Sequence, residues 1–316
     1  MSDGCGTYAH WTLHVWVPSE QLAHALNELR DVEASVVKPV GDLPADAGDV
    51  EVIVPGWPIT RERFAEMVAA NPKLRLVQTA SAGVDHLIDL VPDTARLCDA
   101  RGVYDTPTAE WILAGILAHR RDLPRYVRQQ AAGEWMPAET PRELAGSRVL
   151  IVGYGSIGAA VEVRLAPFDV SVSRVARTAR DGVGAIDELP RLLPDADIVV
   201  VIVPLTDLTR GLVDKDFLAA MPDGALLVNA ARGQVVDTDA LLAELTTRRL
   251  GAVLDVTDPE PLPAGHPLWS APGLLLTPHV GGPTTALPAR LRELVVRQVE
   301  RYRDGNALDN VVTDGY

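Results

Sequence analysis

Three residues of the sequence combine the chemistry that interconverts a ketone and an alcohol. Arg232, Glu260 and His279 each stand a few residues past the end of a short apolar stretch. Such stretches are typical of strands in a parallel sheet that helices cover on both faces, and the carboxyl ends of these strands form the edge where α/β proteins bind ligands. We therefore expect the three side chains at one edge, after strands predicted at 225–228, 252–254 and 274–276.

Each of these side chains has a distinct chemical use. Arginine holds a carboxylate through two parallel hydrogen bonds, and histidine gives or takes the proton of a hydroxyl group. Free histidine, with a pKa of about 6.5, is only about a quarter protonated at pH 7. A glutamate partner that raises this pKa by about one unit makes it about three-quarters protonated, which favours a general acid for carbonyl reduction. The hydride must come from a cofactor, because no side chain can supply one.

A glycine-rich segment predicts the kind of cofactor. Gly153, Gly155 and Gly158 form the pattern G-x-G-x-x-G directly after the apolar strand predicted at 148–152 and before a helix. The first glycine permits the tight turn, the second lets the backbone approach a pyrophosphate, and the third lets the helix pack on the strand. The helix N-terminus adds amide donors and positive potential. The segment therefore predicts a dinucleotide site.

The end of the next strand bears on the choice between NAD(H) and NADP(H). An NAD site usually has an acidic residue there, about 20 residues after the glycines, for the ribose hydroxyls. We predict this strand at 170–175, and no acidic residue stands at its end. Arg174, Arg177 and Thr178 stand there instead, and guanidinium groups bind a 2′-phosphate that a carboxylate would repel. The sequence therefore favours NADP(H), with NAD(H) possible.

Strand-like and helix-like patterns alternate along the rest of the chain. A helix is predicted from the cap at Thr106 and Pro107 to about His119, and the stretch 133–146 indicates an irregular arm or linker. The alternation predicts an α/β fold with doubly wound sheets. Further strands are expected at 12–17, 34–37, 50–54, 74–79 and 198–203, and further helices after Ser19 and Thr60.

Composition excludes several classes of function. The chain has 316 residues, enough for about two domains, and a formal net charge of −14. So acidic a chain lacks the electrostatic footprint for nucleic acid or an anionic membrane. Its two cysteines, Cys5 and Cys98, form neither a disulfide framework nor a metal-binding spacing. No targeting segment or membrane span is recognisable, so we expect a soluble cytoplasmic protein.

In their order and spacing, these segments resemble the D-isomer-specific 2-hydroxyacid dehydrogenase family, and within it the NADP-preferring branch similar to glyoxylate/hydroxypyruvate reductases. The resemblance implies an NAD(P)-dependent enzyme that acts on a small 2-keto or 2-hydroxy acid. It covers almost the whole chain and includes, besides the segments above, residues 81–85, 109–110, 204–209, 236–237 and 266–269.

The resemblance also assigns roles to residues. Arg232 would bind the carboxylate and carbonyl of the substrate, and Glu260 would pair with His279, the acid/base. Trp57, which follows a predicted strand, would line the acyl pocket. Backbone amides of three consecutive residues would hold the other face of the carboxylate: Ala82, Gly83 and Val84. The dinucleotide would contact the three glycines, the three side chains named above at the strand end, and also Arg232 and His279. Its further contacts would be Tyr154, Ser156, Ile157, Pro204, Thr209, Ala230, Ala231, Asp255 and Gly281.

The family fold implies two Rossmann-like doubly wound parallel-sheet domains, of which the substrate domain is discontinuous. Here it would consist of residues 1–101 and 284–316, around a dinucleotide-binding domain at 102–283. The active site would lie in the cleft between them. Family members are commonly homodimers that pair through the cofactor domain, with an arm near Trp135 that reaches the partner subunit.

Four positions differ from residues that are common in the family or in some of its branches. Ala176 stands where many members have an acidic residue, as expected for the NADP-preferring branch. Asp169 stands where a glycine is usual. Ala82 replaces the lysine of phosphite-oxidising relatives, and Glu260 replaces the glutamine of formate dehydrogenases. The last two favour a 2-keto/2-hydroxy acid as substrate.

Two alternatives remain open from the sequence. The first is a dinucleotide-sensing binding protein on the same fold, similar to the related transcriptional corepressors, which can keep the arginine, glutamate and histidine. The second is NAD-dependent oxidation of a D-hydroxy acid. Glyoxylate, hydroxypyruvate, pyruvate and phenylpyruvate are all compatible with the motifs.

Overall fold

The computed structural model describes residues 11–137 and 140–313. The chain divides into two compact units, here called the first and the second unit. The second unit spans Tyr104–Thr284, and the first consists of the chain before and after it. The sequence predicts domain boundaries after residues 101 and 283. The two units of the structure are divided after Val103 and after Thr284.

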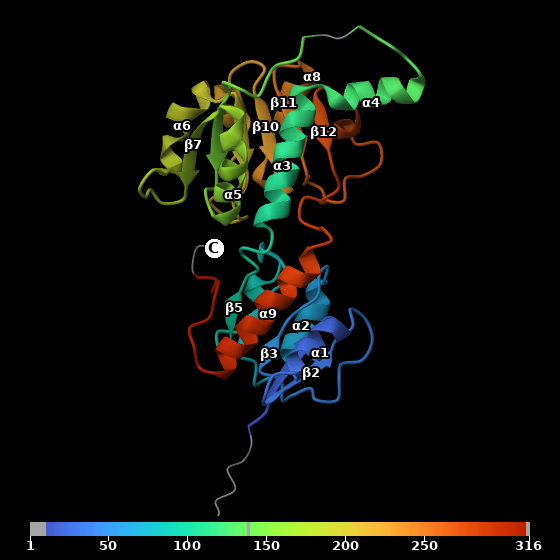
Figure 1. Ribbon diagram of the computed structural model, residues 1–316, viewed down its shortest axis with the longest axis vertical. Helices are drawn as coiled ribbons and strands as arrows, with labels where there is room; N and C mark the ends of the chain where they lie inside the picture. Colours follow the sequence, from blue (N-terminus) through green and yellow to red (C-terminus); the bar gives the residue numbers. More distant parts are fainter. Residues whose placement is uncertain (1–10, 138–139, 314–316) are drawn as a thin grey trace, which may run out of the picture. The chain divides into compact units, whose positions relative to one another are not determined.

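The first unit is built around a five-stranded parallel sheet with the order β2-β1-β3-β4-β5. This is the order of doubly wound flavodoxin-like folds. Figure 1 labels β2, β3 and β5 of this sheet. The unit is discontinuous, because its last helix comes from the end of the chain. Its elements are β1 (Leu13–Val17), α1 (Glu20–Asn27), β2 (Val32–Val36), β3 (Val52–Ile53), α2 (Arg61–Ala69), β4 (Leu76–Gln78), β5 (Arg96–Cys98) and α9 (Leu287–Arg303).

The second unit has a seven-stranded parallel sheet with the order β12-β11-β10-β9-β6-β7-β8. The predicted α/β architecture of two doubly wound parallel sheets is thus confirmed. The strands are β6 (Arg148–Val152), β7 (Ser171–Ala176), β8 (Gly184–Ala185), β9 (Ile198–Val201), β10 (Leu226–Asn229), β11 (Gly251–Leu254) and β12 (Leu274–Leu276). The helices are α3 (Asp105–Arg120), α4 (Leu123–Ala132), α5 (Ser156–Leu165), α6 (Leu189–Leu192), α7 (Lys215–Ala220) and α8 (Thr238–Thr246).

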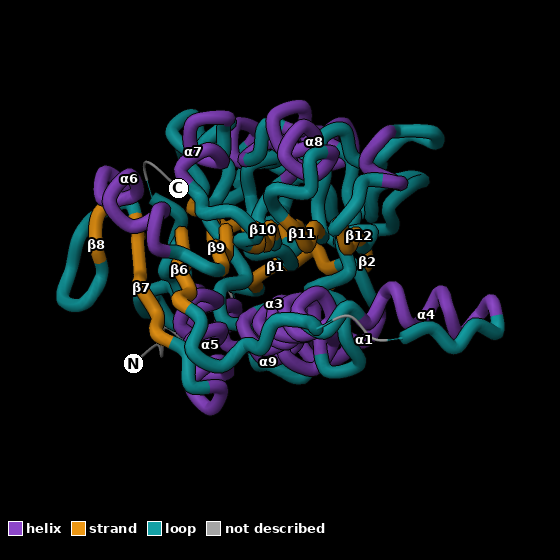
Figure 2. The backbone as a smooth tube through the Cα atoms, turned by 90° about the horizontal axis from the view of Figure 1, so that it is seen from above, coloured by secondary structure: helices purple, strands orange, loops and turns teal. Residues whose placement is uncertain are grey.

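Helices cover both faces of this seven-stranded sheet. Figure 2 shows α3 and α5 on one side of the strands and α7 and α8 on the other. Strand β6 shows why the sequence folds in this way. Val149 and Ile151 pack in the core with α3 and α5, whereas Leu150 and Val152 pack in the core on the opposite face. A strand that is apolar on both faces needs two helical layers, and this arrangement leaves the carboxyl edge of the sheet for loops.

Two local features differ from the sequence-based expectations. Helix α3 begins at Asp105 with Tyr104 at the N-cap position and no side-chain cap, so Thr106 lies within the helix and does not cap it. Helix α4 follows α3 closely, and the sequence analysis did not predict it. It was missed because none of its residues is buried, so it lacks the apolar periodicity of a core helix.

Asp169, which stands where the family usually has glycine, has a left-handed backbone with a φ of 54°. Glycine adopts this conformation without cost, and aspartate is among the few other residues that visit it routinely. The backbone requirement therefore explains both the usual glycine and the aspartate of this chain.

Cys98 lies fully buried with a free thiol. Burial raises the pKa of this thiol to about 12, so it is not a reactive thiolate at neutral pH. Cys5 lies outside the described residues. Within the described ranges, no helix has the length and apolar character that a membrane-spanning segment requires.

Candidate active site

The loops after β10, β11 and β12 carry the three predicted catalytic side chains. His279 Nδ1 lies 2.7 Å from Glu260 Oε1. An ionised carboxylate only accepts hydrogen bonds, so Nδ1 carries the hydrogen and donates it to Glu260. This leaves Nε2 as the ring atom that can exchange a proton with a ligand. The side chains of His279 and Glu260 are 38% and 40% exposed, so a ligand can reach the pair.

The electrostatics of Glu260 link all three residues. Partial burial acts to raise the pKa of this carboxyl, but the hydrogen bond and charge of His279, a backbone hydrogen bond from Thr257 and the charge of Arg232 outweigh it. The pKa of Glu260 therefore lies below its usual range, and the side chain stays ionised at neutral pH. Because Arg232 contributes to this shift, the three side chains share one electrostatic environment.

A buried asparagine shapes the turn that presents Arg232. Asn229, at the end of β10, is fully buried. Its Oδ1 accepts from the backbone nitrogen of Ala231 at 3.0 Å, and its Nδ2 donates to the carbonyl oxygen of Arg232 at 3.0 Å. Arg232 Nη1 in turn donates to the carbonyl oxygen of Ala231 at 2.8 Å. The turn is thus held from inside the sheet, and Arg232 has little freedom at its backbone.

The next residue, Gly233, lets two loops touch. A Cβ atom placed on Gly233 would lie 1.9 Å from the carbonyl oxygen and 2.0 Å from the carbonyl carbon of Thr257. No side chain fits this space, so only glycine permits the contact. The contact brings the loop after β10, with Arg232, against the loop after β11, with Glu260.

Asp255, at the end of β11, ties down the loop that carries His279. Its side chain is 4% exposed. The carboxylate accepts from Thr277 Oγ1 at 2.6 Å and from the backbone nitrogens of Val280 at 2.8 Å and Gly281 at 2.7 Å. Asp255 and Gly281, both predicted to contact the dinucleotide, are therefore hydrogen-bonded to each other beside His279.

The glycine segment forms the turn between β6 and α5. Gly153 has a φ of 101°, and a Cβ there would lie 2.5 Å from the backbone of Ile202. A Cβ on Gly158 would come within 3.1 Å of the carbonyl oxygen of Gly153, whereas a Cβ on Gly155 meets no atom within 4 Å. The first and third glycines are thus needed for packing, and the second leaves space above the N-terminus of α5, where the pyrophosphate of a dinucleotide fits.

Other residues predicted around the glycine segment are held within the second unit. Ser156 Oγ donates to Asp105 Oδ1 at 2.9 Å, and Ile157 packs against the core beneath α3. In the loop after β9, Thr209 Oγ1 donates to the carbonyl oxygen of Pro204 at 2.6 Å. Ala230 lies with Ala231 in the turn after β10, as described above.

The structure separates the three side chains predicted for a 2′-phosphate. Arg174 points to α5, where its Nε donates to Glu162 Oε2 at 2.6 Å and its second nitrogen pairs with Glu162 Oε1. In the described part of the chain, no hydrogen bond or ion pair engages the side chain of Arg177 or Thr178. Arg174 is therefore already neutralised by a carboxylate, whereas Arg177 and Thr178 are available to a ligand.

Arg180, which the sequence analysis did not single out, extends this group. Its guanidinium donates to the carbonyl oxygen of Tyr154 and lies 5.8 Å from the centre of the Tyr154 ring. Tyr154 Oη donates to Glu162 Oε2 at 2.5 Å, and Arg174 Nη1 donates to the carbonyl oxygen of Gly182 at 3.3 Å. These contacts join the glycine segment to the turn after β7, with Arg180 as its exposed cation.

The residues predicted to hold a substrate carboxylate lie in the first unit, in the loop after β4. Ser81 Oγ donates to the carbonyl oxygen of Gly83 at 2.8 Å, and Thr79 Oγ1 donates to the carbonyl oxygen of Ser81 at 2.8 Å. Val84 is fully buried, whereas Ala82 and Gly83 are partly exposed. The loop is thus fixed by its own side chains, with Ala82 and Gly83 at the surface of the unit.

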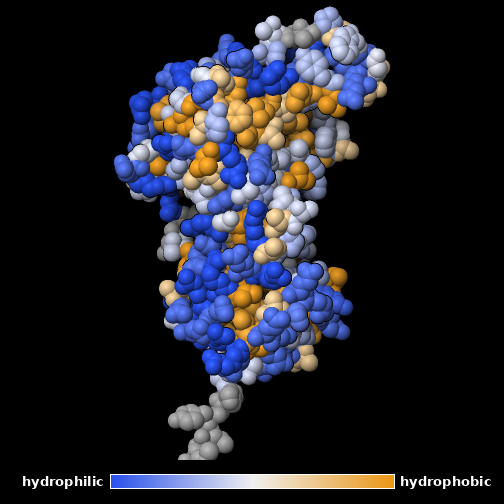
Figure 3. All heavy atoms as spheres, in the orientation of Figure 1, coloured by the Kyte–Doolittle hydropathy of each residue, from blue (hydrophilic) through white to orange (hydrophobic). Residues whose placement is uncertain are grey.

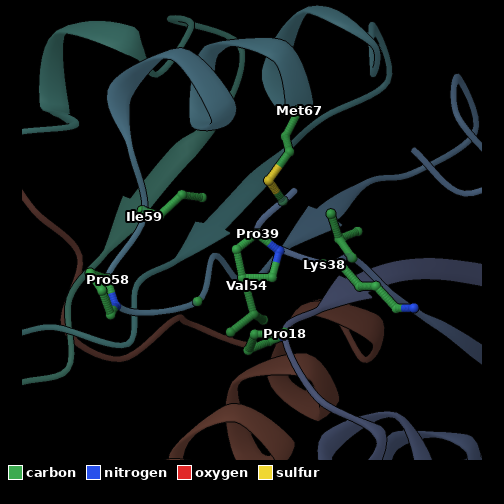
Figure 4. A pocket seen from close by; sticks show the side chains of 9 residues that line it. Pro18, Lys38, Pro39, Val54, Pro58, Ile59 and Met67 are labelled. Carbon is green, nitrogen blue, oxygen red and sulfur yellow. The ribbon is translucent and has the colours of Figure 1, made fainter. Parts of the chain in front are cut away.

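Trp57 also lies in the first unit and is 49% exposed. Its ring meets the ring of His86 edge to face, with centroids 5.0 Å apart. The hollow shown in Figure 4 lies beside it and is lined by Gly56 and Pro58, but Trp57 does not line it. Its volume of about 20 Å³ accommodates about one water molecule. This hollow is therefore too small for the side chain of a substrate.

Sequence reasoning missed four residues that shape the site: Asn229, Glu162, Arg180 and Trp111. Asn229 lies in the same segment as Arg232, and an amide directly after a buried strand could have indicated a turn-forming role. Glu162 and Trp111 lie on helices, where the pattern gives only a surface or a core position. Trp111 Nε1 donates to Thr277 Oγ1 at 3.1 Å.

The chain is similar in sequence to members of one enzyme family. The sequence model of the D-isomer specific 2-hydroxyacid dehydrogenase NAD binding domain matches residues 113–281. A glyoxylate reductase of Thermofilum pendens is 35% identical over 256 residues, which cover 76% of this chain and 75% of that protein.

The chain is also similar to solved structures. A D-isomer specific 2-hydroxyacid dehydrogenase from Xanthobacter autotrophicus, in complex with NADPH and MES, has a TM-score of 0.81 at 31% identity and covers 96% of this chain and 98% of its own. An NADPH-dependent glyoxylate/hydroxypyruvate reductase from Sinorhizobium meliloti, in complex with NADP and malonate, has a TM-score of 0.79 at 25% identity and covers 95% and 97%.

The family match spans the glycine segment and the three residues predicted to be catalytic, and the relatives extend it over most of the chain. A nicotinamide dinucleotide is thus the cofactor of the second unit. The chain belongs to the D-isomer specific 2-hydroxyacid dehydrogenase family and is an NAD(P)-dependent enzyme of that family.

Proposed function

We propose that this enzyme reduces a small 2-keto acid to the D-2-hydroxy acid and prefers NADPH to NADH. The observation that carries the proposal is the hydrogen bond between His279 Nδ1 and Glu260 Oε1, in the electrostatic reach of Arg232. The pair holds a proton donor at His279 Nε2, and the guanidinium supplies the charge that binds a carboxylate. The glyoxylate reductase and the NADPH-dependent glyoxylate/hydroxypyruvate reductase named above support this class of substrate.

In the proposed reaction, Arg232 binds the carboxylate and polarises the carbonyl oxygen of the substrate. The nicotinamide ring, when bound, supplies the hydride to the carbonyl carbon. His279 Nε2 donates its proton to the carbonyl oxygen, which becomes the hydroxyl group. Glu260 keeps the hydrogen bond to Nδ1 and stabilises the ring while it is positively charged. In the reverse direction His279 takes the proton back.

The first unit would contribute the remaining substrate contacts. We propose that the backbone amides of Ala82, Gly83 and Val84 hold the other face of the carboxylate, and that Trp57 lines the acyl pocket. The fixed loop after β4 supports this role, because its side-chain hydrogen bonds hold the backbone in one conformation. A preorganised anion site loses less entropy when a ligand binds.

The residues around β6 and α5 fit a dinucleotide. The open space at Gly155 and the N-terminus of α5 would receive the pyrophosphate, with Tyr154, Ser156 and Ile157 around it. Pro204, Thr209, Ala230, Ala231, Asp255 and Gly281 remain proposed contacts along the carboxyl edge of the same sheet.

The preference for NADPH rests on the charges after β7. The strand ends at Ala176 with no acidic residue, and Arg177, Thr178 and Arg180 follow it. These donors would hold the 2′-phosphate, since charge-assisted hydrogen bonds to a guanidinium are strong. Arg174, which the sequence assigned to the phosphate, would instead position the turn, because Glu162 already occupies its guanidinium.

The first experiment is to follow the absorbance decay of NADPH and of NADH over a panel of 2-keto acids from glyoxylate to phenylpyruvate. Faster oxidation of NADPH with any one acid supports reaction and cofactor together, and the best acid gives the size of the acyl pocket. Faster oxidation of NADH would contradict the cofactor preference alone. Tight dinucleotide binding without turnover would favour the dinucleotide-sensing binding protein.

We further propose a cytoplasmic homodimer that pairs through the second unit. Helix α4 buries none of its residues, and its Leu123 and Val127, one turn apart, are 49% and 62% exposed. Trp135, just beyond it, is 99% exposed, and apolar side chains gather on the face of the unit that carries α3 and α5 (Figure 3). Exposed apolar area of this kind favours burial by a second copy. Sedimentation equilibrium of Val127→Glu, compared with the unmodified enzyme, tests the pairing, since a charge there should yield monomers.

A further inference from the structure

We propose that Trp111 and Thr277 are positioning residues for His279, and that they act through the buried carboxylate of Asp255. The inference rests on the proposed role of His279 as the acid/base. It assigns a catalytic consequence to an indole on helix α3 and to a hydroxyl group two residues before the histidine, neither of which touches the reacting atoms.

His279 needs such support because its own backbone is unfavourable. The residue has a φ of 55°, in the left-handed region. Residues that carry a Cβ atom rarely adopt this backbone conformation, and the conformation persists only where the surrounding structure holds it. Without that support, the loop would relax and carry the imidazole away from its working position.

The support comes from four hydrogen bonds that surround His279 and end on one residue. The backbone nitrogen of His279 donates to the carbonyl oxygen of Asp255 at 2.8 Å. The side-chain carboxylate of Asp255 accepts from residues on both sides of the histidine, namely Thr277, Val280 and Gly281. Since a carboxylate is an acceptor for several donors at once, Asp255 fixes the loop before, at and after the catalytic residue.

Two hydrogen bonds in series lead from Trp111 on α3 to Asp255, and the donor and acceptor groups of the side chains fix their direction. The carboxylate of Asp255 can only accept, so the single hydrogen of the Thr277 hydroxyl goes to it. The indole of Trp111 can only donate, and its Nε1 therefore uses a lone pair of the same hydroxyl oxygen, at 3.1 Å. The order Trp111 to Thr277 to Asp255 has no alternative arrangement, so removal of either donor leaves a defined gap.

Packing places the indole where this chain requires it. A Cβ on Gly281 would lie 2.8 Å from Asp255 Oδ2 and 3.3 Å from Cγ of Trp111, so the loop backbone fills the space between carboxylate and ring. One turn further along α3, a Cβ on Gly115 would lie 2.6 Å from Val253 Cγ1 of β11. The glycine lets α3 approach β11, the strand that Asp255 directly follows, and this approach brings Trp111 to Thr277.

The test uses substitutions that remove one donor each. Thr277→Val removes the hydroxyl and keeps the shape, and Trp111→Phe removes the indole nitrogen and keeps an aromatic ring. We expect kcat to fall about 10–100-fold in Thr277→Val, as small misplacements of reacting groups do, and about tenfold or less in Trp111→Phe, with the KM for the dinucleotide within about twofold. Thr277→Ser, which restores the hydroxyl, should recover kcat to within about threefold. Thr246→Val and Trp11→Phe are the matched controls and should keep kcat, because they remove a hydroxyl and an indole donor whose hydrogen-bond partners, Leu242 and Glu51, lie outside the loop.

The double variant Trp111→Phe/Thr277→Val shows whether the two substitutions lower kcat through one shared series of hydrogen bonds or independently of each other. If Trp111 acts through Thr277, the double variant should be no slower than Thr277→Val alone, whereas independent effects would multiply. Multiplied losses, or kcat within twofold of the unmodified enzyme in both single variants, would overturn the proposal.

A second readout does not depend on turnover. Hydrogen exchange measured by mass spectrometry on a peptide that covers 277–282 reports the opening of the loop amides that bond to Asp255. We expect faster exchange there in Thr277→Val and Trp111→Phe and no change in Thr277→Ser or the two controls. Unchanged exchange would refute the positioning role. Faster exchange in an enzyme that reduces none of the acids would instead refute the proposed function and leave the loop anchor in place.

Discussion

Glu260 and Glu162 each hold a basic side chain in the second unit, but at opposite ends of the proposed dinucleotide site. Glu260 accepts from His279 in the loops after β11 and β12, and Glu162 on α5 accepts from Arg174 on β7. The exposed fractions are of the same order, 38% and 40% for the first pair and 33% and 20% for the second. Burial is therefore not the reason why we propose proton transfer for the first pair and a structural role for the second.

The difference lies in the base. Histidine can change its charge near neutral pH, so a carboxylate beside it stabilises one of two accessible states. Arginine stays charged at every relevant pH, so its carboxylate gains only a fixed ion pair. The hydrogen bond from Arg174 accordingly lowers the pKa of Glu162. Under the proposed mechanism, the same kind of contact serves proton transfer at one end and fixed geometry at the other.

The largest effect is expected at the pair of His279 and Glu260. His279→Ala removes the proposed proton donor, and we expect kcat to fall about 10³-fold, within the range of general acid–base contributions. Dinucleotide binding, measured by fluorescence titration, should stay within about threefold, because the glycine segment is untouched. A loss of less than tenfold in kcat would show that another group donates the proton and would remove the contrast between the pairs.

An intermediate effect is expected at the adenosine end. Changing Arg177 and Arg180 together to alanine should weaken NADPH about 10²-fold and NADH less than about threefold, because two charge-assisted hydrogen bonds to the 2′-phosphate are lost. Arg174→Ala is the matched control, since it removes the arginine that is already paired with Glu162.

Calorimetric titration with 2′,5′-ADP and with 5′-AMP isolates this effect from turnover. Arg174→Ala should weaken both nucleotides to a similar, smaller extent. A loss confined to 2′,5′-ADP in Arg174→Ala would make that residue a phosphate ligand and contradict the structural role assigned to its pair.

The smallest effect is expected on stability. Because the folded-state pKa of Glu162 is lowered, its ion pair stabilises the fold at neutral pH and loses this contribution as the pH falls through that pKa. A partly exposed pair contributes about 1 kcal/mol, so Glu162→Gln should lower Tm by about 2–4 °C at pH 7. Thermal unfolding followed by circular dichroism should show the gap to the unmodified protein closing below about pH 4. A gap that stays constant with pH would mean that packing and not charge accounts for the loss.

The contrast also shows what sequence could predict. The sequence could predict that Arg232, Glu260 and His279 lie at one edge of a sheet, because each follows an apolar stretch and parallel strands align their carboxyl ends. The sequence assigns Arg174 to a phosphate and does not reveal its partner, Glu162. This partner lies on α5, and the crossover from β6 to β7 brings it to Arg174. Trp111 was hidden for the same reason, since 166 positions separate it from Thr277. Strand order and motif spacing are local properties, whereas these pairings depend on how elements pack.

The contact at Gly233 bears on how this enzyme can diversify. Any substitution at this position places an atom inside the backbone of Thr257, so a saturation library should tolerate glycine there and reject the rest. A homologue that lacks this glycine is therefore a candidate for lost catalysis even when its histidine and arginine persist. We therefore expect variation in substrate range at exposed positions such as Trp57, the proposed wall of the acyl pocket, and almost no tolerated substitution at Gly233.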